Sequence, residues 1–306
     1  MNKVIIIAGP TAVGKTKTAV ETAKKLNTHI ISCDSMQIYK KMDIGTAKVT
    51  EDEKENIPHH LIDIVEPDEY YSVGSYAEDS QKEIKKLFAQ NLVPVFAGGT
   101  GLYINSIIYK MDFNDTSKDD DIRKKFETYY KEHGQEALFE LLAKKDKHAA
   151  DSIDRQNVKR VIRALEITEK NSSVKPFNKI ARKQDYQSML YVLYLDRAVL
   201  YERINSRVDK MIESGLIEEV ESILKSGISR DAVSLKAIGY RQIIDYLDGK
   251  TDKESAIELI KRDSRRYAKR QYTWFKRYDF AKWIDVQTHS PSDIANLIYD
   301  EIKTFN

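Results

Sequence analysis

Residues 4–16 read VIIIAGPTAVGKT, a short apolar run that leads into a glycine-bounded loop. The last eight letters fit the pattern of a glycine, four residues and then Gly-Lys-Thr. In this pattern backbone N–H groups converge on phosphate oxygens, the lysine adds a point charge and the threonine hydroxyl can hold Mg²⁺. The stretch therefore predicts a phosphate-binding loop between a strand and a helix. Its residues are Gly9, Pro10, Thr11, Ala12, Val13, Gly14, Lys15 and Thr16, with Thr16 as the metal ligand.

Three further apolar runs predict a parallel sheet around this first strand. They lie at residues 29–33, 92–97 and 190–195, and amphipathic or charged stretches separate them. Such runs are typical of strands that are buried on both faces, and a strand, glycine loop, helix and second strand form a right-handed βαβ unit. We therefore expect an α/β protein, with a P-loop NTPase-like parallel sheet flanked by helices.

The segment between the third and fourth runs has a different character. It opens with acidic residues and continues in helix-like stretches near 122–132 and 157–170, which predict a helical insertion. Near the end of the chain, Ser290 is the expected N-cap of a last helix. The expected domains are a core of residues 1–113 and 188–306 and an insertion of residues 114–187.

The composition excludes several classes of protein. Of 306 residues, 41% are hydrophobic and 32% are charged, which argues for a folded chain rather than a disordered one. The single cysteine, Cys33, cannot build a disulfide framework and is expected to be a buried small side chain. No apolar run approaches the ~18 residues of a membrane span, and no targeting segment is visible. We expect a cytoplasmic monomer that does not bind membranes.

Polar residues follow two of the other expected strands. Asp34 ends the second, within Asp34-Ser35-Met36-Gln37, and the third ends in Gly98-Gly99-Thr100-Gly101. The carboxyl ends of parallel strands are where ligands bind. There Asp34 could act as a general base, help a metal ion, or cap the next helix, and the glycine turn could bind an anion or only reverse the chain.

Basic residues are unevenly distributed. Arg203 and Arg207 are four apart after the fourth strand and could stabilise a leaving pyrophosphate, or form a solvated stripe paired with Glu202 or Asp209. Residues 261–277 hold eight basic residues and one acid, with aromatic residues between them. That stretch favours RNA over a merely solvated face, although its aromatic residues could equally face the core.

Seven motifs together resemble one family, the tRNA dimethylallyltransferases. They occur in order along nearly the whole chain: GPTAVGKT at 9–16, DSMQ at 34–37, HHLID at 59–63, GGTGLY at 98–103, RALE at 163–166, GYRQ at 239–242, and KRQ at 269–271 followed by Thr273-Trp274. The resemblance implies transfer of a dimethylallyl group from dimethylallyl diphosphate to N6 of adenosine 37, beside the anticodon of tRNAs that read codons beginning with U. Mg²⁺ is the expected cofactor, and the anticodon stem-loop is the expected partner, contacted by the insertion.

The resemblance also implies roles for individual residues. Asp34 resembles the general base, Thr100 a catalytic residue in the reaction channel, and Arg207 and Arg203 the arginines that grip the diphosphate. The expected catalytic residues are Asp34, Thr100, Lys15 and Arg207. The expected tRNA-contacting residues are Asp34, Ser35, Met36, Gln37, Thr100, Arg123, Val158, Lys159, Arg160, Val161, Ile162, Arg163, Gly239, Tyr240, Arg241, Gln242, Lys269 and Arg270. A P-loop nucleoside or small-molecule kinase, and an RNA-binding module without catalysis, are the alternatives.

Overall fold

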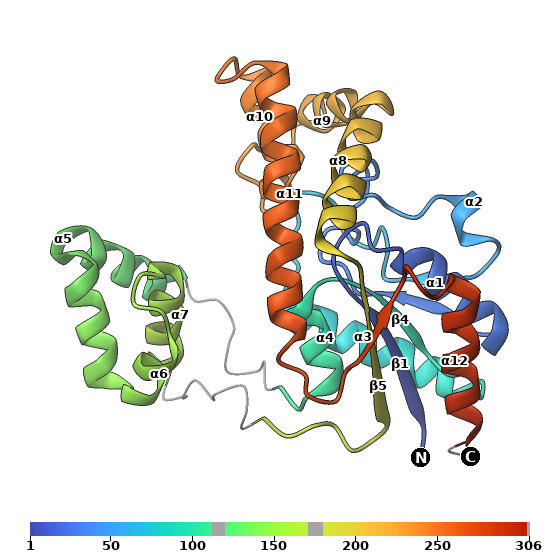
Figure 1. The fold of residues 1–306 in the computed structure, drawn as a ribbon. Coiled ribbons are helices and arrows are strands. Elements are labelled where there is room, and N and C mark those ends of the chain that lie inside the picture. Colours follow the sequence, from blue (N-terminus) through green and yellow to red (C-terminus); the bar gives the residue numbers. More distant parts are fainter. Residues whose placement is uncertain (112–119, 171–179, 305–306) are drawn as a thin grey trace. The chain divides into compact units, whose positions relative to one another are not determined.

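The computed structural model describes residues 1–111, 120–170 and 180–304 (Figure 1). Two compact units are present, one made of Met1–Ile107 and Gln184–Asn306 and the other of Ile108–Lys183. The second unit begins and ends a few residues before the boundaries of 114 and 187 expected from the sequence. The role expected for it stays a prediction.

A six-stranded sheet forms the centre of the first unit. Its order is β3-β2-β4-β1-β5-β6, and all neighbouring strands are parallel, so the predicted α/β class is confirmed. The strands are β1 (Lys3–Ala8), β2 (Ile30–Ser32), β3 (His59–His60), β4 (Val95–Gly98), β5 (Gln187–Tyr194) and β6 (Lys282–Asp285). The sequence predicts β1, β2, β4 and β5, but the short edge strands β3 and β6 were missed.

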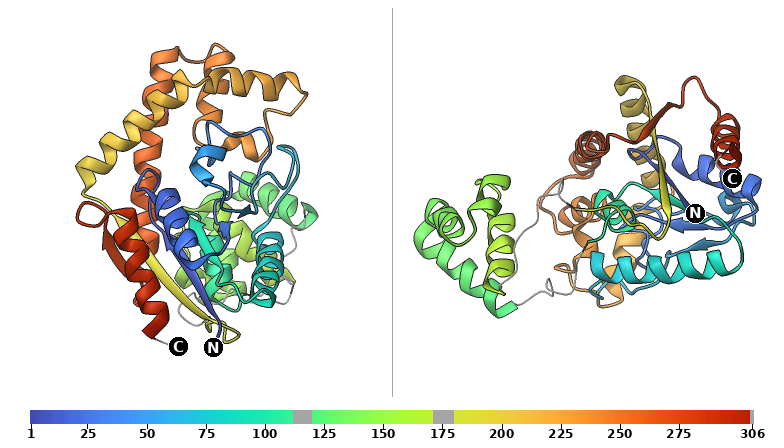
Figure 2. Two further views of the ribbon diagram at one scale, coloured as in Figure 1. Left: turned by 90° about the vertical axis from the view of Figure 1, so that its right-hand side faces the viewer. Right: turned by 90° about the horizontal axis from the view of Figure 1, so that it is seen from below.

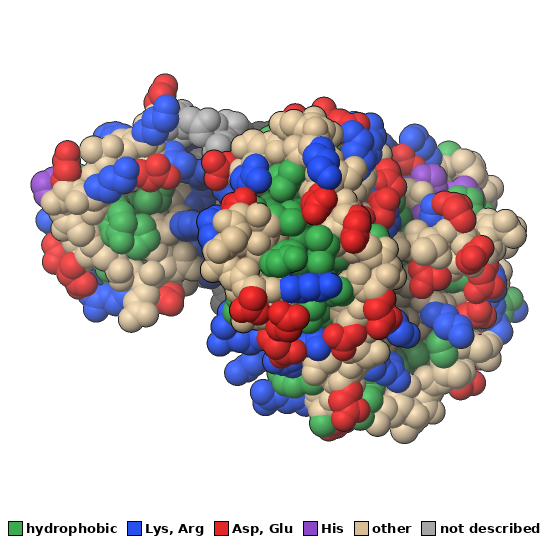
Figure 3. Space-filling view, turned by 90° about the horizontal axis from the view of Figure 1, so that it is seen from above, with side chains coloured by type: hydrophobic (Ala, Val, Ile, Leu, Met, Phe, Trp, Pro, Cys, Tyr) green, Lys and Arg blue, Asp and Glu red, His purple; other side chains and the backbone are tan. Residues whose placement is uncertain are grey.

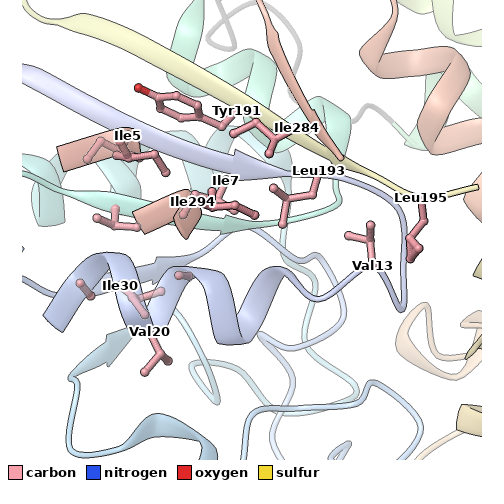
Figure 4. Packing of buried hydrophobic residues seen from close by; sticks show 14 of the residues in the cluster. Ile5, Ile7, Val13, Val20, Ile30, Tyr191, Leu193, Leu195, Ile284 and Ile294 are labelled. Carbon is pink, nitrogen blue, oxygen red and sulfur yellow. The ribbon is translucent and has the colours of Figure 1, made fainter. Parts of the chain in front are cut away.

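One face of the sheet packs against α1 (Lys15–Leu26) and α12 (Pro291–Thr304). Ile5, Ile7 and Leu193 of the strands belong to one buried cluster with Val20 on α1 and Ile294 on α12 (Figure 4). Ser290 caps α12 as expected, since its Oγ accepts from the Asp293 N–H at 3.2 Å. The apolar cluster on this face also includes Ala12 and Val13 of the phosphate loop.

The alternate residues of the strands lie on the opposite face. Ile6 and Phe96 are fully buried there, which explains why the strands read as continuous apolar runs. Helices α3 (Val73–Ala89) and α4 (Gly101–Ile108) are joined by a stacked pair, Tyr76 and Tyr103, whose ring centroids are 3.8 Å apart. The Tyr76 hydroxyl donates to the Ser32 carbonyl at the end of β2 and so ties α3 to the sheet.

Four helices of the first unit extend beyond the carboxyl edge of the sheet (Figures 1 and 2). They are α8 (Arg197–Glu213), α9 (Leu216–Lys225), α10 (Tyr240–Leu247) and α11 (Lys253–Phe275). Their apolar residues form a second core together with Ile38, Tyr39 and Met42 from the segment that follows β2. The short α2 (Glu51–Lys54) and a 3₁₀ turn at Ser234–Lys236 complete this unit.

The second unit contains three described helices with a core of their own. They are α5 (Asp120–Lys145), with non-helical backbone at Gly134, α6 (Lys147–Ser152) and α7 (Val158–Glu169). Phe126, Leu138 and Leu165 are fully buried among them. None of the described helices in either unit is long and apolar enough to cross a membrane.

Candidate active site

The phosphate loop, residues 9–16, leaves β1 at Ala8 and enters α1 at Lys15, as predicted. The backbone conformation of the loop requires glycine at both of its glycine positions. Gly9 has φ 148°, and a Cβ there would lie 2.7 Å from the Leu193 carbonyl oxygen on β5. Gly14 has φ 104° and is the left-handed residue that starts α1. The loop therefore presents its N–H groups at the N-terminus of α1, where the helix dipole favours an anion.

Lys15 lies within the loop and its ammonium donates to the Pro10 carbonyl at 2.8 Å. The pKa of Lys15 is lowered to about 8, chiefly by burial; Asp34 raises it and Arg207 adds to the lowering. A negative charge beside the ammonium would raise the pKa again, so a bound diphosphate favours the charged form. The three side chains that act on one another here come from three separate segments of the chain.

Asp34 and Thr100 lie in two turns that follow the adjacent strands β2 and β4 and are hydrogen-bonded to each other. The Thr100 N–H donates to the Cys33 carbonyl at 3.1 Å, and its Oγ1 accepts from the Ser35 N–H at 2.9 Å. One Asp34 carboxylate oxygen accepts from the Met36 N–H at 2.9 Å. A turn, and no helix, directly follows Asp34, so this residue caps a turn. Asp34 and Thr100 follow adjacent strands and therefore lie at the same edge of the sheet.

Arg203 and Arg207, the two arginines of α8 expected at the diphosphate, both have exposed side chains. Arg207 lowers the pKa of Lys15. Desolvation by the surrounding protein lowers the pKa of Arg207 itself, whereas the Glu53 carboxylate raises it. Asp209, one of the acids that could have neutralised these arginines, pairs with Lys261 at 2.7 Å. Arg207 is thus placed beside the phosphate loop, and Arg203 precedes it by about one turn.

The aromatic residues of α11 pack on the loops of the site. Trp274 lies against Gly101, where a Cβ would meet the indole Nε1 at 2.2 Å, and this nitrogen donates to the Tyr278 hydroxyl at 3.2 Å. Burial and Asp34 raise the pKa of the Tyr267 phenol, whereas a hydrogen bond with Thr100 lowers it. Tyr267 was not among the expected site residues. Its spacing on α11 fits a residue that faces the core as well as one that stacks on RNA bases, and it does not show the interaction with Thr100.

The basic surface of α11 is less positive than its sequence indicates. Arg262 pairs with Asp263 at 3.0 Å, and Lys261 pairs with Asp209 and Glu258. Seen from the end of the unit that carries α8 to α11, acidic and basic side chains are interspersed around a hydrophobic patch (Figure 3). Lys269 and Arg270 are exposed and make no ion pair within the described residues, although the Arg270 guanidinium lies over the Tyr267 ring.

Of the four expected tRNA contacts at 239–242, only Arg241 is exposed. Tyr240 is fully buried and its hydroxyl donates to Glu219 at 2.6 Å. The side-chain Oε1 of Gln242 accepts from the Gly239 N–H at 3.0 Å and so caps α10. The side chains of Tyr240 and Gln242 therefore hold this turn, and Arg241 is the side chain that a polynucleotide can reach.

Arg123 and Arg163 in the second unit share one buried acid. The Glu166 carboxylate, 1% exposed, accepts from Arg123 Nε at 2.6 Å and from Arg163 Nη1 at 2.6 Å. A buried carboxylate needs such partners, because an unpaired charge is costly away from water. Arg123 therefore links α5 to α7 through Glu166, and Arg163, on the same helix as Glu166, also pairs with its carboxylate.

The remaining expected contacts on α7 divide between surface and core. Lys159 and Arg160 are exposed in the first turn of the helix, and Val158 is half-buried. Val161 and Ile162 are buried in the core of this unit, so their side chains cannot reach a ligand. Arg155 lies just before the start of this helix and pairs with Glu136.

No group of three or more His, Cys, Asp or Glu side chains that could hold a metal ion occurs in residues 1–111, 120–170 and 180–304. The adjacent His59 and His60 form β3, and His60 Nδ1 lies 3.2 Å from Glu83. Burial lowers the pKa of both imidazoles. Cys33 is fully buried as expected, and burial raises the pKa of its thiol to about 12.

Comparison with known proteins places this geometry in a family. A family model described as IPP transferase matches residues 37–278, and one described as isopentenyl transferase matches residues 2–63. The chain belongs to the IPP transferase family. Within that family, it is 45% identical over 306 residues to the tRNA dimethylallyltransferase of Thermoanaerobacter pseudethanolicus, covering 98% of this chain and 95% of the relative. It is 46% identical over 305 residues to that of Clostridioides difficile, covering 98% of each.

Solved structures of the IPP transferase family also match the fold. The tRNA isopentenylpyrophosphate transferase of Bacillus halodurans superposes with a TM-score of 0.75 at 42% identity, over 99% of this chain and 98% of the other. A eukaryotic dimethylallyltransferase acting on tRNA superposes with a TM-score of 0.84 at 26% identity, over 99% of this chain and 80% of the other. The resemblance expected from the sequence motifs is therefore confirmed over the full length.

Proposed function

We propose that this chain transfers a dimethylallyl group from dimethylallyl diphosphate to N6 of adenosine 37 in tRNAs that read codons beginning with U, releasing diphosphate. The observation that carries the proposal is the convergence of Lys15, Asp34 and Arg207 at the carboxyl edge of the sheet. The match to tRNA dimethylallyltransferases over nearly the whole chain supports the same reaction.

The phosphate loop is suited to a departing diphosphate. Its N–H groups, Lys15 and Arg207 offer positive potential where charge grows on the leaving oxygens as the carbon–oxygen bond breaks. Arg203 extends this potential along α8. Because the loop recognises only phosphates, the same fold can serve a prenyl diphosphate as well as a nucleotide.

A magnesium ion fits the residues present. Mg²⁺ often keeps several waters and is held through substrate phosphates with few protein ligands, so it needs no preformed cluster of acids. Thr16, exposed in the first turn of α1, would hold it. When bound, the ion neutralises negative charge on the diphosphate.

Asp34 is the proposed general base and Thr100 its partner in the turn. The exocyclic amine of adenine is conjugated with the ring and is a weak nucleophile, so a carboxylate that takes its proton as the carbon–nitrogen bond forms lowers the barrier. Thr100 holds the backbone beside Asp34 through the Ser35 N–H. In this step N6 gains the prenyl carbon, the diphosphate takes the bonding electron pair, and Asp34 receives the proton.

The exposed basic residues are the proposed contacts with the anticodon stem-loop. Lys159 and Arg160 lie at the positive N-terminal turn of α7, and Lys269, Arg270 and Arg241 lie on the first unit. The half-buried residues 34–37 would meet the extruded base, since a stacked base cannot reach such a site. We propose that the chain binds and modifies tRNA as a monomer in the cytoplasm. Sedimentation of the free protein and of its tRNA complex would test the monomeric state.

The deciding experiment incubates the protein with radiolabelled dimethylallyl diphosphate, Mg²⁺ and an anticodon stem-loop that carries adenosines at 36, 37 and 38. We expect label in the RNA without ATP, and none when adenosine 37 is replaced by guanosine. The kinase alternative, which the comparisons do not favour, requires ATP to be consumed at each turnover. Binding of the stem-loop without transfer would leave only the non-catalytic RNA-binding module.

A further inference from the structure

Gln271 on α11 joins the two loops of the site. Its side chain is buried, with 6% exposed, and both ends of its amide are used. The carbonyl oxygen accepts from the Thr11 N–H in the phosphate loop at 2.9 Å, and the nitrogen donates to the Gly99 carbonyl beside Thr100 at 3.0 Å. Nothing in the spacing of the sequence shows this link, because its partners lie 260 and 172 residues away.

The amide fills the space where the two loops leave adjacent strands. Ala8 on β1 pairs with Gly98 on β4, so Gly9 and Gly99 begin the loops side by side. A Cβ on Gly99 would lie 2.1 Å from the Gln271 nitrogen and 3.3 Å from the Gly9 carbonyl oxygen. The loops and the amide are therefore packed so closely that a shift of the amide moves at least one loop.

The rest of α11 fixes Gln271 from behind. Trp274, three residues later, packs on Gly101, and the Tyr267 phenol, four residues earlier, interacts with Thr100. The Tyr272 hydroxyl accepts from the Leu195 N–H at 3.0 Å and donates to its carbonyl at 3.2 Å, just after β5. Because α11 is attached to the ends of three strands, the amide sits on a rigid support.

We propose that Gln271 is a positioning residue that sets the separation between the phosphate loop and the Thr100 turn, and hence between the leaving diphosphate and the accepting amine. This inference rests on the roles given above to those two loops. A side-chain amide is suited to the position because it accepts and donates at once, which a carboxylate or a thioether cannot do. A misplacement of about 1 Å between reacting groups can cost about 100-fold in rate, so the expected effect falls on the chemical step.

The first test compares Gln271→Met with the control Gln81→Met. Methionine has nearly the same volume but makes neither hydrogen bond, and Gln81 donates to the Tyr186 hydroxyl at 3.0 Å within the same unit. We expect Gln271→Met to lower kcat at least about tenfold, with the KM for the stem-loop and the thermal unfolding temperature close to those of Gln81→Met. If kcat equals that of the control, or falls only as far as the folded fraction falls, the proposal is overturned.

A second variant, Gln271→Glu, tests the donor alone. The carboxylate can still accept from the Thr11 N–H but repels the Gly99 carbonyl, whereas the protonated acid restores both bonds. Burial raises the pKa of a carboxyl group, so lowering the pH should rescue the variant. We expect its rate relative to wild type to rise several-fold from mildly alkaline to mildly acidic pH; a ratio that stays constant contradicts the inference.

Failure of the proposed function gives a different result. If the wild-type chain transfers no label, the general reaction is wrong, and calorimetric binding of inorganic pyrophosphate then tests Gln271 by itself. A several-fold weaker affinity in Gln271→Met than in Gln81→Met would support its hold on the phosphate loop. Equal affinities would overturn it.

Discussion

The phosphate loop and the basic surfaces of the molecule both present positive charge, but they do so in different ways. The phosphate-binding groups of the loop come from eight consecutive residues, and the conformations of its glycines fix how the backbone enters α1. The basic surfaces draw on helices that also meet acids of other helices, as Lys261 does at Asp209 and Arg123 at Glu166. A local motif thus keeps its chemistry through folding, whereas a count of surface charges does not.

The largest effect should come from Asp34, which lies in the turn beside the phosphate loop and acts on the charge of Lys15. In Asp34→Asn the amide oxygen can still accept the Met36 N–H, so the turn is preserved while the base is lost. We expect the single-turnover rate to fall by about 10²–10⁴-fold, with stem-loop affinity in filter binding unchanged. A rate close to that of wild type would remove Asp34 from its role.

The next effect concerns the charge of Lys15. Its pKa of about 8 lies below the usual 10.5, so the ammonium is present below pH 8 and is lost as the pH rises through that value. Pyrophosphate affinity, relative to that of Lys15→Arg, should therefore fall by up to about tenfold for each pH unit above that point. Isothermal titration measures it, and the arginine variant, charged throughout, corrects for the ionisation of pyrophosphate. A ratio independent of pH would show that Lys15 does not titrate in the loop.

A smaller effect is expected on the basic surfaces. Lys159→Ala combined with Arg160→Ala should weaken stem-loop binding and reduce the slope of log affinity against log salt by about 0.7–0.9 for each lost phosphate contact. Arg155 and Arg262 are matched controls, because each is already paired with an acid. Their double alanine variant should change the slope less. Equal changes in the two double variants would mean that ion pairing does not decide which cations bind RNA.

The smallest effect sharpens the comparison within one helix. Arg163→Ala removes one partner of the buried Glu166 and should destabilise the second unit by about 1–3 kcal/mol. Lys159→Ala, on the exposed surface of the same helix, should change stability by less than about 0.5 kcal/mol. Chemical denaturation of the full-length variants measures both. If the two variants lose the same free energy of unfolding, the ion pair between Arg163 and Glu166 does not stabilise the unit.

The strands that could be predicted are those with enough apolar residues to form a run. β1, β2, β4 and β5 met that condition, but β3 consists of two histidines and β6 of a mixed stretch at the sheet edge. Edge strands have one neighbour and less burial, so their residues carry little pattern. The predicted α1 and α12 were right because glycine and serine caps mark helix ends locally.

The expected site residues differ in the same way. The positions of the loop residues followed from their motif, and Cys33 was buried as its apolar neighbours implied. By contrast, Val161 and Ile162 were expected at the RNA surface and lie in the core of the second unit. The contact of Tyr267 with Thr100 depends on how α11 meets the sheet, which no local pattern records.

By itself, the sequence determined the strand, loop and helix that bind phosphate, because glycine geometry, apolar runs and helix caps act between neighbouring residues. Its ordered motifs also determined the family. Only the tertiary structure decided which charges remain available and which groups meet: Arg207 beside Lys15, Gln271 between two loops, and Glu166 under two arginines. The packing of α8 and α11 at the sheet edge brings Arg207 and Gln271 to the phosphate loop, and the packing of α5 on α7 brings Arg123 to Glu166. Neither arrangement depends on neighbouring residues alone, so no local pattern shows it.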